Sequence, residues 1–234
     1  MIAVLGAMAI EIETLKAQMC DVLCQTHFGQ VFFTGTLRGV PIVLTCCGVG
    51  KVNAARAAQL CISTYPVKLM LNTGVAGGLL PALSAGSVVI SSALVQHDVD
   101  TSALGDPVGF VSGCDLVYFA ADVSVAASLL VAAEKVAPGS ALMGVIASGD
   151  GFIADKEKND AIRSTFSAAA VDMESAAIAQ ICHLCTVPFA AVRTISDGAN
   201  EDSPMDFPTL AAMAARNAEG ILLEFISASA SDWM

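Results

Sequence analysis

Basic residues are scarce in this sequence. Its 234 residues include 11 Lys and Arg against 22 Asp and Glu, which gives a formal net charge of −11. Neutralising the phosphates of a nucleic acid requires clusters of basic side chains, and an anionic membrane surface attracts the same clusters. The sequence therefore predicts neither a nucleic-acid partner nor a membrane partner.

Charged residues of either sign are also few. They make up 14% of the chain, whereas hydrophobic residues make up 55%. So few charges cover the surface of a monomer poorly, and we expect part of the apolar surface to be buried against a second subunit. The alternative is an alanine-rich monomer, because alanine raises the hydrophobic fraction while contributing little apolar area.

We expect this chain to have no leader, no linker and no membrane-spanning run. Its longest uncharged stretch, residues 69–96, is interrupted by Asn72, Pro81 and several glycines, which favours strand, turn and strand over a membrane helix. Residues 1–11 carry no basic flank and no cleavage site. No Ser/Gly tract, charge block or repeat interrupts the pattern. We therefore expect a single domain over residues 1–234, located in the cytoplasm.

Motifs for metals and cofactors are absent as well. The sequence has no paired CxxC, HExxH, GxSxG or GxxxxGK[ST] motif, and its glycines at 48–50 and 74–78 lack the GxGxxG spacing. Cys182 and Cys185 flank His183 without a fourth ligand nearby, so the eight cysteines are expected to be reduced core thiols. We predict neither a metal nor a cofactor.

Short apolar runs alternate with helical patterns along the whole chain. Several runs are continuous Val, Ile and Leu, typical of strands covered on both faces. The alternation predicts an α/β fold, a three-layer α/β/α sandwich around a mostly parallel or mixed central sheet. The expected strands are residues 2–5, 31–37, 42–47, 69–73, 87–94, 142–147, 169–171 and 189–195. The expected helices are residues 9–19, 52–65, 123–135, 156–166, 175–184 and 208–228.

Acids and glycines gather where these expected strands end. Glu11, Glu174 and Asp197 each follow a strand, and a glycine turn over residues 74–78 follows another. Ligands of α/β sheets bind at the carboxyl ends of the strands, so we expect the three acids to converge on one cleft. Each acid also has a structural interpretation: Glu11 as a solvated helix residue, Glu174 as a first-turn acid favoured by the helix dipole, and Asp197 as a turn residue.

Five segments, in register along the chain, resemble one family. They are Gly6-Ala7-Met8 with Glu11, Asn72-Thr73-Gly74-Val75-Ala76-Gly77-Gly78, Ser148-Gly149-Asp150-Gly151-Phe152-Ile153, Val171-Asp172-Met173-Glu174 and Arg193-Thr194-Ile195-Ser196-Asp197. From residue 1 to about residue 226 the chain is similar to the 5′-methylthioadenosine/S-adenosylhomocysteine nucleosidases. That family has the nucleoside phosphorylase fold and hydrolyses the N-glycosidic bond of both substrates, which releases adenine.

The resemblance implies catalytic roles for two acids. Asp197 would protonate adenine at N7, and Glu11 would activate the attacking water. Phe152 would stack on the purine, the main chain of Ile153 would read its Watson–Crick edge, and Glu174 would bind the ribose hydroxyls. The substrate contacts implied in full are Met8, Val75, Gly77, Phe152, Ile153, Asp172, Met173, Glu174, Arg193, Ser196 and Phe207. The resemblance also implies a homodimer in which residues around 101–107 of the partner close the 5′-thio pocket.

The chemistry of the leaving group agrees with these roles. Adenine leaves poorly as an anion, so Asp197 must either hold its proton through a pKa raised above about 3.9 or transfer it only as the base departs. The ribosyl centre becomes oxocarbenium-like, and Glu11 and Glu174 would stabilise that positive charge.

Water is the expected nucleophile. A phosphorylase holds its phosphate dianion with arginines at the turn after the first strand. Here residues 8–13 contain two acids and no base. A nucleoside phosphorylase of the same fold and a non-enzymatic adenosine-binding protein are the two alternatives.

Two positions depart from the family pattern. Val75 stands where the family often has Ser, and Asp172 stands where it often has Glu. Val75, together with residues 96–100, resembles the branch that also accepts aminodeoxyfutalosine, so that nucleoside is a further expected substrate.

Overall fold

The computed structural model describes residues 1–197 and 207–228, and the side chains of Asp197 and Phe207 lie outside this description. The strands are β1 (Ile2–Gly6), β2 (Cys20–His27), β3 (Gln30–Leu37), β4 (Val40–Cys46), β5 (Leu69–Gly78), β6 (Val88–Gln96), β7 (Tyr118–Ala120), β8 (Ala141–Ser148), β9 (Ala168–Asp172) and β10 (Phe189–Asp197). The helices are α1 (Glu13–Gln18), α2 (Lys51–Thr64), α3 (Val123–Val136), α4 (Lys156–Phe166), α5 (Ser175–Leu184) and α6 (Phe207–Ala228), with 3-10 turns η1 (Ala9–Glu11) and η2 (Ser102–Leu104).

The strands form one mixed sheet in the order β10-β6-β8-β9-β5-β1-β4-β3-β2, with β7 beside β6. Strand β5 is parallel to β1 and β10 and antiparallel to β9. Because β5 pairs with both β9 and β10, the strands β5, β10, β6, β8 and β9 close into a ring. The expected α/β fold with a mixed central sheet is confirmed, and this closure is a feature that the sequence pattern did not reveal.

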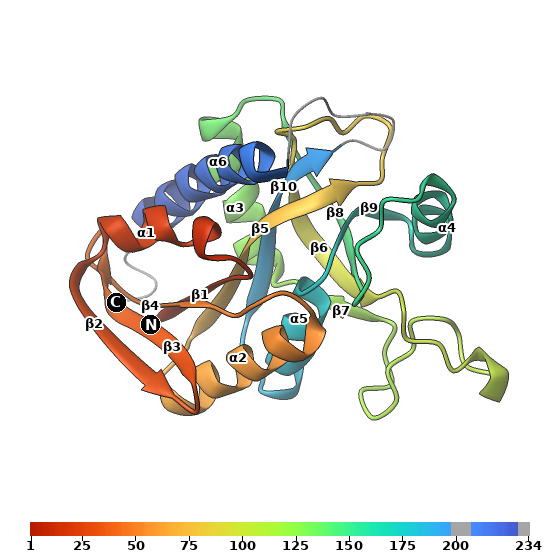
Figure 1. Ribbon diagram of the computed structural model, residues 1–234, viewed down its shortest axis with the longest axis horizontal. Helices are drawn as coiled ribbons and strands as arrows, with labels where there is room; N and C mark the ends of the chain where they lie inside the picture. Colours follow the sequence, from red (N-terminus) through yellow and green to blue (C-terminus); the bar gives the residue numbers. More distant parts are fainter. Residues whose placement is uncertain (198–206, 229–234) are drawn as a thin grey trace.

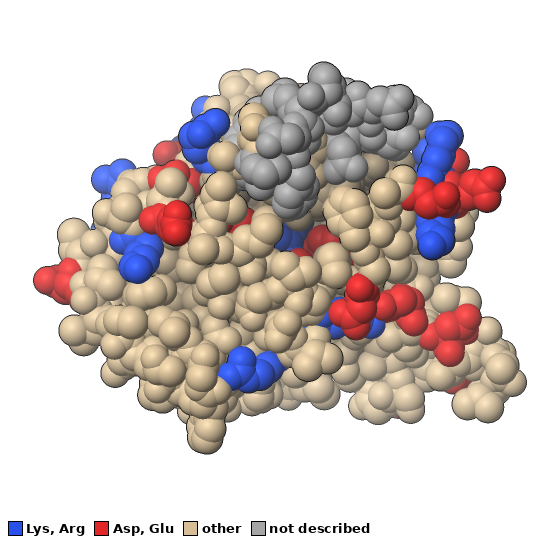
Figure 2. All heavy atoms as spheres, viewed as in Figure 1, with Lys and Arg blue, Asp and Glu red and all other residues tan. Residues whose placement is uncertain are grey.

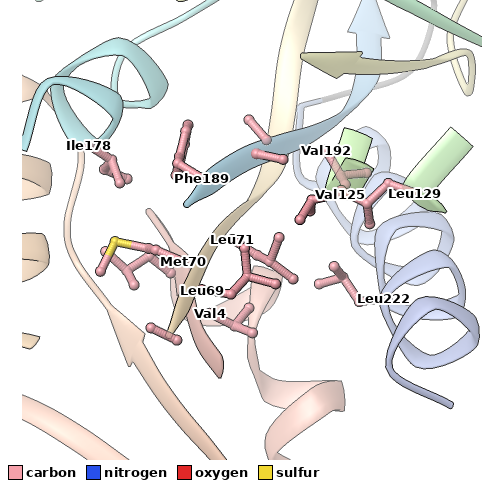
Figure 3. Close-up of a cluster of buried hydrophobic side chains, with 14 of the residues drawn as sticks. Val4, Leu69, Met70, Leu71, Val125, Leu129, Ile178, Phe189, Val192 and Leu222 are labelled. Carbon is pink, nitrogen blue, oxygen red and sulfur yellow. The ribbon is translucent and has the colours of Figure 1, made fainter. Parts of the chain in front are cut away.

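Helices cover both faces of the sheet (Figure 1). Helices α2 and α5 pack together on one side, whereas α3 and α6 pack together on the other. Successive side chains of β5 point to opposite faces of the sheet and contact the two helix layers in turn. Met70 faces Ile178 of α5, whereas Leu71 lies on the side of Leu129 in α3 and Leu222 in α6 (Figure 3). All five side chains are fully buried. A strand with apolar contacts on both faces reads as a continuous apolar run, which is the pattern that predicted it.

The expected glycine turn over residues 74–78 is wrong, because β5 runs through it to Gly78. Gly77 and Gly78 pair with β9, and Gly77 also lies opposite Asp197 in β10. Gly74 has φ +151°, and a side chain there would collide with Arg193 and Glu11. Gly74 therefore allows buried charged groups to approach the strand, and the segment does not turn the chain.

Other boundaries also differ from expectation. The helix expected over residues 9–19 is split into η1 and α1 at Ile12, whose φ of −123° is not helical. Strand β2 was not expected because it is an exposed edge strand without a continuous apolar run, and β7 has only three residues. Between β6 and β7 the chain extends away from the main body through η2 (Figure 1). No helix within residues 1–197 and 207–228 is long and apolar enough to cross a membrane.

Candidate active site

A cavity of about 190 Å³ opens where the carboxyl ends of several strands meet. Its walls come from the segments after β1, β4 and β8 and from the last residues of β5, β9 and β10. In Figure 2 acidic and basic atoms are visible at the floor of a hollow near the centre of a mostly uncharged face. The lining residues are Ala7, Met8, Glu11, Val49, Val75, Ala76, Gly77, Gly151, Phe152, Ile153, Val171, Asp172, Met173, Glu174 and Ser196.

Glu11 is a buried carboxylate held entirely by backbone donors. Its Oε2 accepts from Ala7 N at 2.7 Å and from Met8 N at 3.0 Å, and its Oε1 accepts from Val75 N at 3.1 Å. The side chain is 3% exposed. The η1 turn bends the chain back so that Glu11 reaches the N–H groups that precede it. The carboxylate thus has one fixed position between the first strand end and β5.

Arg193 of β10 organises the acids beneath the cavity. It is fully buried. Its Nε donates to Asp172 Oδ2 at 2.7 Å, its Nη2 to Asn72 Oδ1 at 2.6 Å and its Nη1 to Thr73 O at 3.1 Å. Its Nη2 also lies 3.5 Å from Glu174 Oε2. Removing such a charge from water is costly unless acceptors surround it, as they do here.

The Asp172 carboxylate accepts hydrogen bonds from several protein groups in addition to Arg193. The hydroxyls of Ser148 and Ser175 donate to it, and so do the backbone N–H groups of Glu174 and Ser175 at 3.3 Å. Asp172 ends β9 and precedes α5, so these contacts fix the first turn of that helix. Its oxygens are therefore occupied by protein donors, although the residue borders the cavity.

Among the Asp and Glu side chains that the structure describes, Glu174 has the most perturbed proton affinity. Its pKa is raised to about 7, chiefly because burial disfavours the charged form. Arg193 and the N–H of Gly50 oppose this shift, whereas the negative charges of Asp172 and Glu11 add to it. Gly50 N donates to Glu174 Oε1 at 2.9 Å. Glu174 can thus exchange a proton near neutral pH, which is common for groups in active sites.

The rest of the cavity is apolar and ends in an aromatic rim. Phe152 lies on the loop after β8 and is 70% exposed at the mouth. Met8, Val75 and Met173 line the walls beside the acids. An apolar pocket with a few convergent polar groups is the usual form of a small-molecule site.

The sequence-predicted residues divide into three groups in the structure. Those that border the cavity are Met8, Glu11, Val75, Gly77, Phe152, Ile153, Asp172, Met173, Glu174 and Ser196. Arg193 is not among them, because its guanidinium is enclosed by protein acceptors beneath the cavity, and its substrate contact stays a prediction. The side chains of Asp197 and Phe207 lie outside the described part of the chain.

Two residues of the loop between β4 and α2 were missed. Val49 borders the cavity, and Gly50 donates to Glu174. The sequence signal for both is Gly48-Val49-Gly50, which follows an expected strand but lacks the spacing of a dinucleotide-binding motif. Among the described residues, no group of three or more His, Cys, Asp and Glu side chains could hold a metal ion.

Fold and site together define a protein of the nucleoside phosphorylase type, with a small-molecule cavity at the strand ends. Comparison with known sequences agrees, since the model of the phosphorylase superfamily matches residues 1–227. A 5′-methylthioadenosine/S-adenosylhomocysteine nucleosidase of Marinomonas sp. is 39% identical over 226 residues, covering 96% of this chain and 97% of that protein. One from Shewanella baltica is 41% identical over 208 residues, covering 88% of this chain and 87% of that protein.

Solved structures give the same result. The nucleosidase of Neisseria meningitidis in complex with methylthio-immucillin-A superposes with a TM-score of 0.92 at 36% identity, covering 97% of this chain and 98% of that chain. The Campylobacter jejuni enzyme gives 0.91 at 32% identity, with the same coverage. The chain belongs to the 5′-methylthioadenosine/S-adenosylhomocysteine nucleosidase family of the phosphorylase superfamily.

Proposed function

We propose that this protein hydrolyses the N-glycosidic bond of 5′-methylthioadenosine and S-adenosylhomocysteine, releasing adenine and the 5-thioribose product. One observation carries the choice of water over phosphate. The described residues that line the cavity include the acids Glu11, Asp172 and Glu174 and no Lys, Arg or His. Among these lining residues a phosphate dianion would meet three acids and no basic side chain, whereas a water molecule can be deprotonated by one of the acids.

Glu11 is the base that activates the water. Its three backbone contacts hold the carboxylate at the cavity wall, so no rearrangement is needed when the water binds. As the C1′–N9 bond breaks, the water oxygen bonds to C1′ and its proton passes to Glu11. The bonding electrons leave with adenine.

Asp197 supplies the proton that adenine takes up at N7. Support comes from its backbone, which pairs with Gly77 at the end of β5, and Gly77 borders the cavity. Protonation turns the departing base into a neutral molecule and lowers the barrier to cleavage. After the reaction, the proton gained by Glu11 must return to Asp197 through solvent before the next turnover.

The other cavity residues bind the nucleoside. Phe152 stacks on the purine while the backbone of Ile153 reads its edge, and Glu174 accepts from the ribose hydroxyls. Met8, Val75, Gly77, Met173, Ser196 and Phe207 enclose the sugar and the 5′ side. Asp172 at the cavity wall and Arg193 beneath it hold these residues in position, because the polar atoms of both already bond to protein partners.

The whole chain, residues 1–234, forms one catalytic domain, which works in the cytoplasm as a homodimer. Support for the dimer comes from exposed apolar side chains: Val49 at the cavity is 48% exposed, Val52 in the first turn of α2 is 77% exposed, and Leu104 in η2 is 83% exposed. In the dimer, residues around 101–107 of one subunit cover the 5′ side of its partner's cavity. Sedimentation velocity tests this assembly: wild type should sediment as a dimer and Leu104→Asp as a monomer, and a monomeric wild type would contradict it.

Product analysis by mass spectrometry tests the reaction. Methylthioadenosine, S-adenosylhomocysteine and aminodeoxyfutalosine are each incubated with the protein, with and without phosphate. We expect adenine and the free 5-thioribose from the first two, at the same rate under both conditions. A ribose 1-phosphate product, formed only with phosphate, would identify a phosphorylase, and binding without turnover would identify a non-enzymatic binding protein.

A further inference from the structure

Three segments are joined by a ring of polar contacts beside the cavity. Lys51 Nζ lies 2.5 Å from Asp98 Oδ1, and Asp98 Oδ2 accepts from Asp150 N at 2.9 Å. Asp150 Oδ1 in turn accepts from Lys51 N at 2.8 Å. The ring therefore links the first turn of α2, the segment after β6 and the loop after β8. The side chain of Lys51 is only 15% exposed, so its ion pair is less screened than one at the open surface.

The ring is adjacent to a hydrogen bond that holds Glu174, the residue proposed to bind the ribose hydroxyls. Gly50 precedes Lys51 and donates its N–H to Glu174 Oε1 at 2.9 Å. Gly50 has φ +96°, a conformation that favours glycine, and a side chain there would also press on Asp150 Oδ1 at 3.2 Å. A glycine can leave this conformation easily, so its orientation depends on what holds the neighbouring residue. Both the side chain and the backbone N–H of that neighbour, Lys51, belong to the ring.

We propose that Lys51 is a positioning residue for Glu174: its ion pair with Asp98 locks the start of α2 so that the Gly50 N–H remains directed at the carboxylate that binds ribose. This proposal rests on the proposed function, which assigns to Glu174 the binding of the ribose hydroxyls. Lys51 itself does not border the cavity. Its effect reaches the substrate only through the Gly50–Glu174 hydrogen bond.

The proton affinity of Glu174 gives a direct readout of that bond. Glu174 is faced by Arg193 from β10, Asp172 from β9, Glu11 from η1 and Cys47 from the loop after β4. The Gly50 N–H lowers the pKa of Glu174. If the N–H turns away, the pKa must rise, and the ribose-binding carboxylate forms only at higher pH.

The experiment compares Lys51→Met with Asp98→Asn. Each variant breaks the ion pair, but the first removes a positive charge and the second a negative charge. If Lys51 positions Gly50, both variants raise the midpoint of the rising limb of kcat/KM against pH. If the ring acts only through its electric field, the two midpoints move in opposite directions, which would overturn the proposal.

Rates and binding supply the second measurement. We expect Lys51→Met to lose about tenfold in kcat/KM for methylthioadenosine, the order of one hydrogen bond to a charged group. Inhibition by adenine, which has no ribose, should change by less than about twofold. Lys51→Arg should recover most of the loss. Lys135→Met, which breaks the ion pair between Lys135 and Glu224 on α3 and α6, is the matched control and should behave as wild type. An equal loss of adenine and nucleoside binding would contradict the proposal.

A measurement without turnover separates this proposal from the proposed function. The carboxyl ¹³C resonance of Glu174, assigned by its absence in Glu174→Gln, is titrated in wild type, Lys51→Met and Asp98→Asn. A rise of the Glu174 pKa in both variants supports the positioning role even if methylthioadenosine proves not to be a substrate. An unchanged pKa contradicts that role even if hydrolysis is found.

Discussion

Replacing Glu11 with Gln tests stability and catalysis at one position. The carboxylate accepts from Ala7 N and Met8 N with one oxygen and from Val75 N with the other. Gln has a single amide oxygen, which can keep the two contacts on one side. Its NH2 group then faces Val75 N–H, and two donors meet in a buried site. Leaving such a buried donor unsatisfied costs about 1–3 kcal/mol, so we expect the free energy of unfolding to fall by that amount.

The same substitution removes the base that the proposed reaction needs. General base catalysis contributes about 10²–10⁴-fold, so turnover of methylthioadenosine should fall by at least about 100-fold. Urea unfolding gives the first quantity, and adenine release under saturating substrate gives the second. Glu13→Gln is the matched control, because Glu13 is an exposed acid in the first turn of α1. It should change stability by less than about 0.5 kcal/mol and leave turnover intact. A Glu11→Gln enzyme that retains more than a tenth of wild-type turnover would refute the role of Glu11 as base.

Three further predictions concern the remaining charged groups. Asp197→Asn should nearly abolish adenine release while calorimetry still detects methylthioadenosine binding; full activity would remove Asp197 from its role as the acid. Because the pKa of Glu174 is raised to about 7, the folded protein binds a proton at this carboxylate more tightly than the unfolded chain does. Protonation of Glu174 therefore stabilises the fold at pH values below the ordinary pKa of Glu, and this stabilisation is lost as the pH rises to about 7. Unfolding of Glu174→Gln should lack this decline between about pH 4.5 and pH 7, and identical pH dependence in both proteins would count against the burial effect. Arg193→Met should lower the free energy of unfolding by about 3–5 kcal/mol in urea titrations, because it leaves Asp172 buried without its cation; a loss below about 1 kcal/mol would show that the ion pair is dispensable.

Periodicity predicted the elements that bury apolar side chains. The expected helices over 156–166 and 175–184 have the bounds of α4 and α5. Strand β2 could not be predicted because it is an exposed edge strand. It is stabilised by pairing with β3, and such pairing leaves no apolar pattern in the sequence. The ring closure depends on pairing between β5 and β10, strands far apart in the chain. Local patterns carry no information about such long-range register.

The sequence predicted which residues gather at the candidate site, but it did not predict which of them face the cavity and which support it from beneath. Spacing placed Glu11 and Glu174 at strand ends, and the cavity brings both together. The sequence alone does not distinguish Arg193 from an arginine that binds a ligand. The difference is burial: hydrogen bonds to Asp172, Asn72 and Thr73 satisfy the guanidinium within the protein. The roles of Gly50 and Lys51 likewise depend on contacts with residues about 50 to 125 positions away in the chain.

The balance of charge around the cavity connects the fold to the proposed chemistry. Glu11, Asp172 and Glu174 lie at the cavity, and Arg193 beneath it neutralises part of their charge. When all three acids are ionised the group remains negative, and burial strengthens its field. A negative pocket destabilises a bound phosphate dianion and stabilises a sugar that becomes positively charged as adenine leaves. The partial protonation of Glu174 near neutral pH limits the cost of this unbalanced charge. One arrangement of acids would therefore both exclude the phosphorylase reaction and promote hydrolysis.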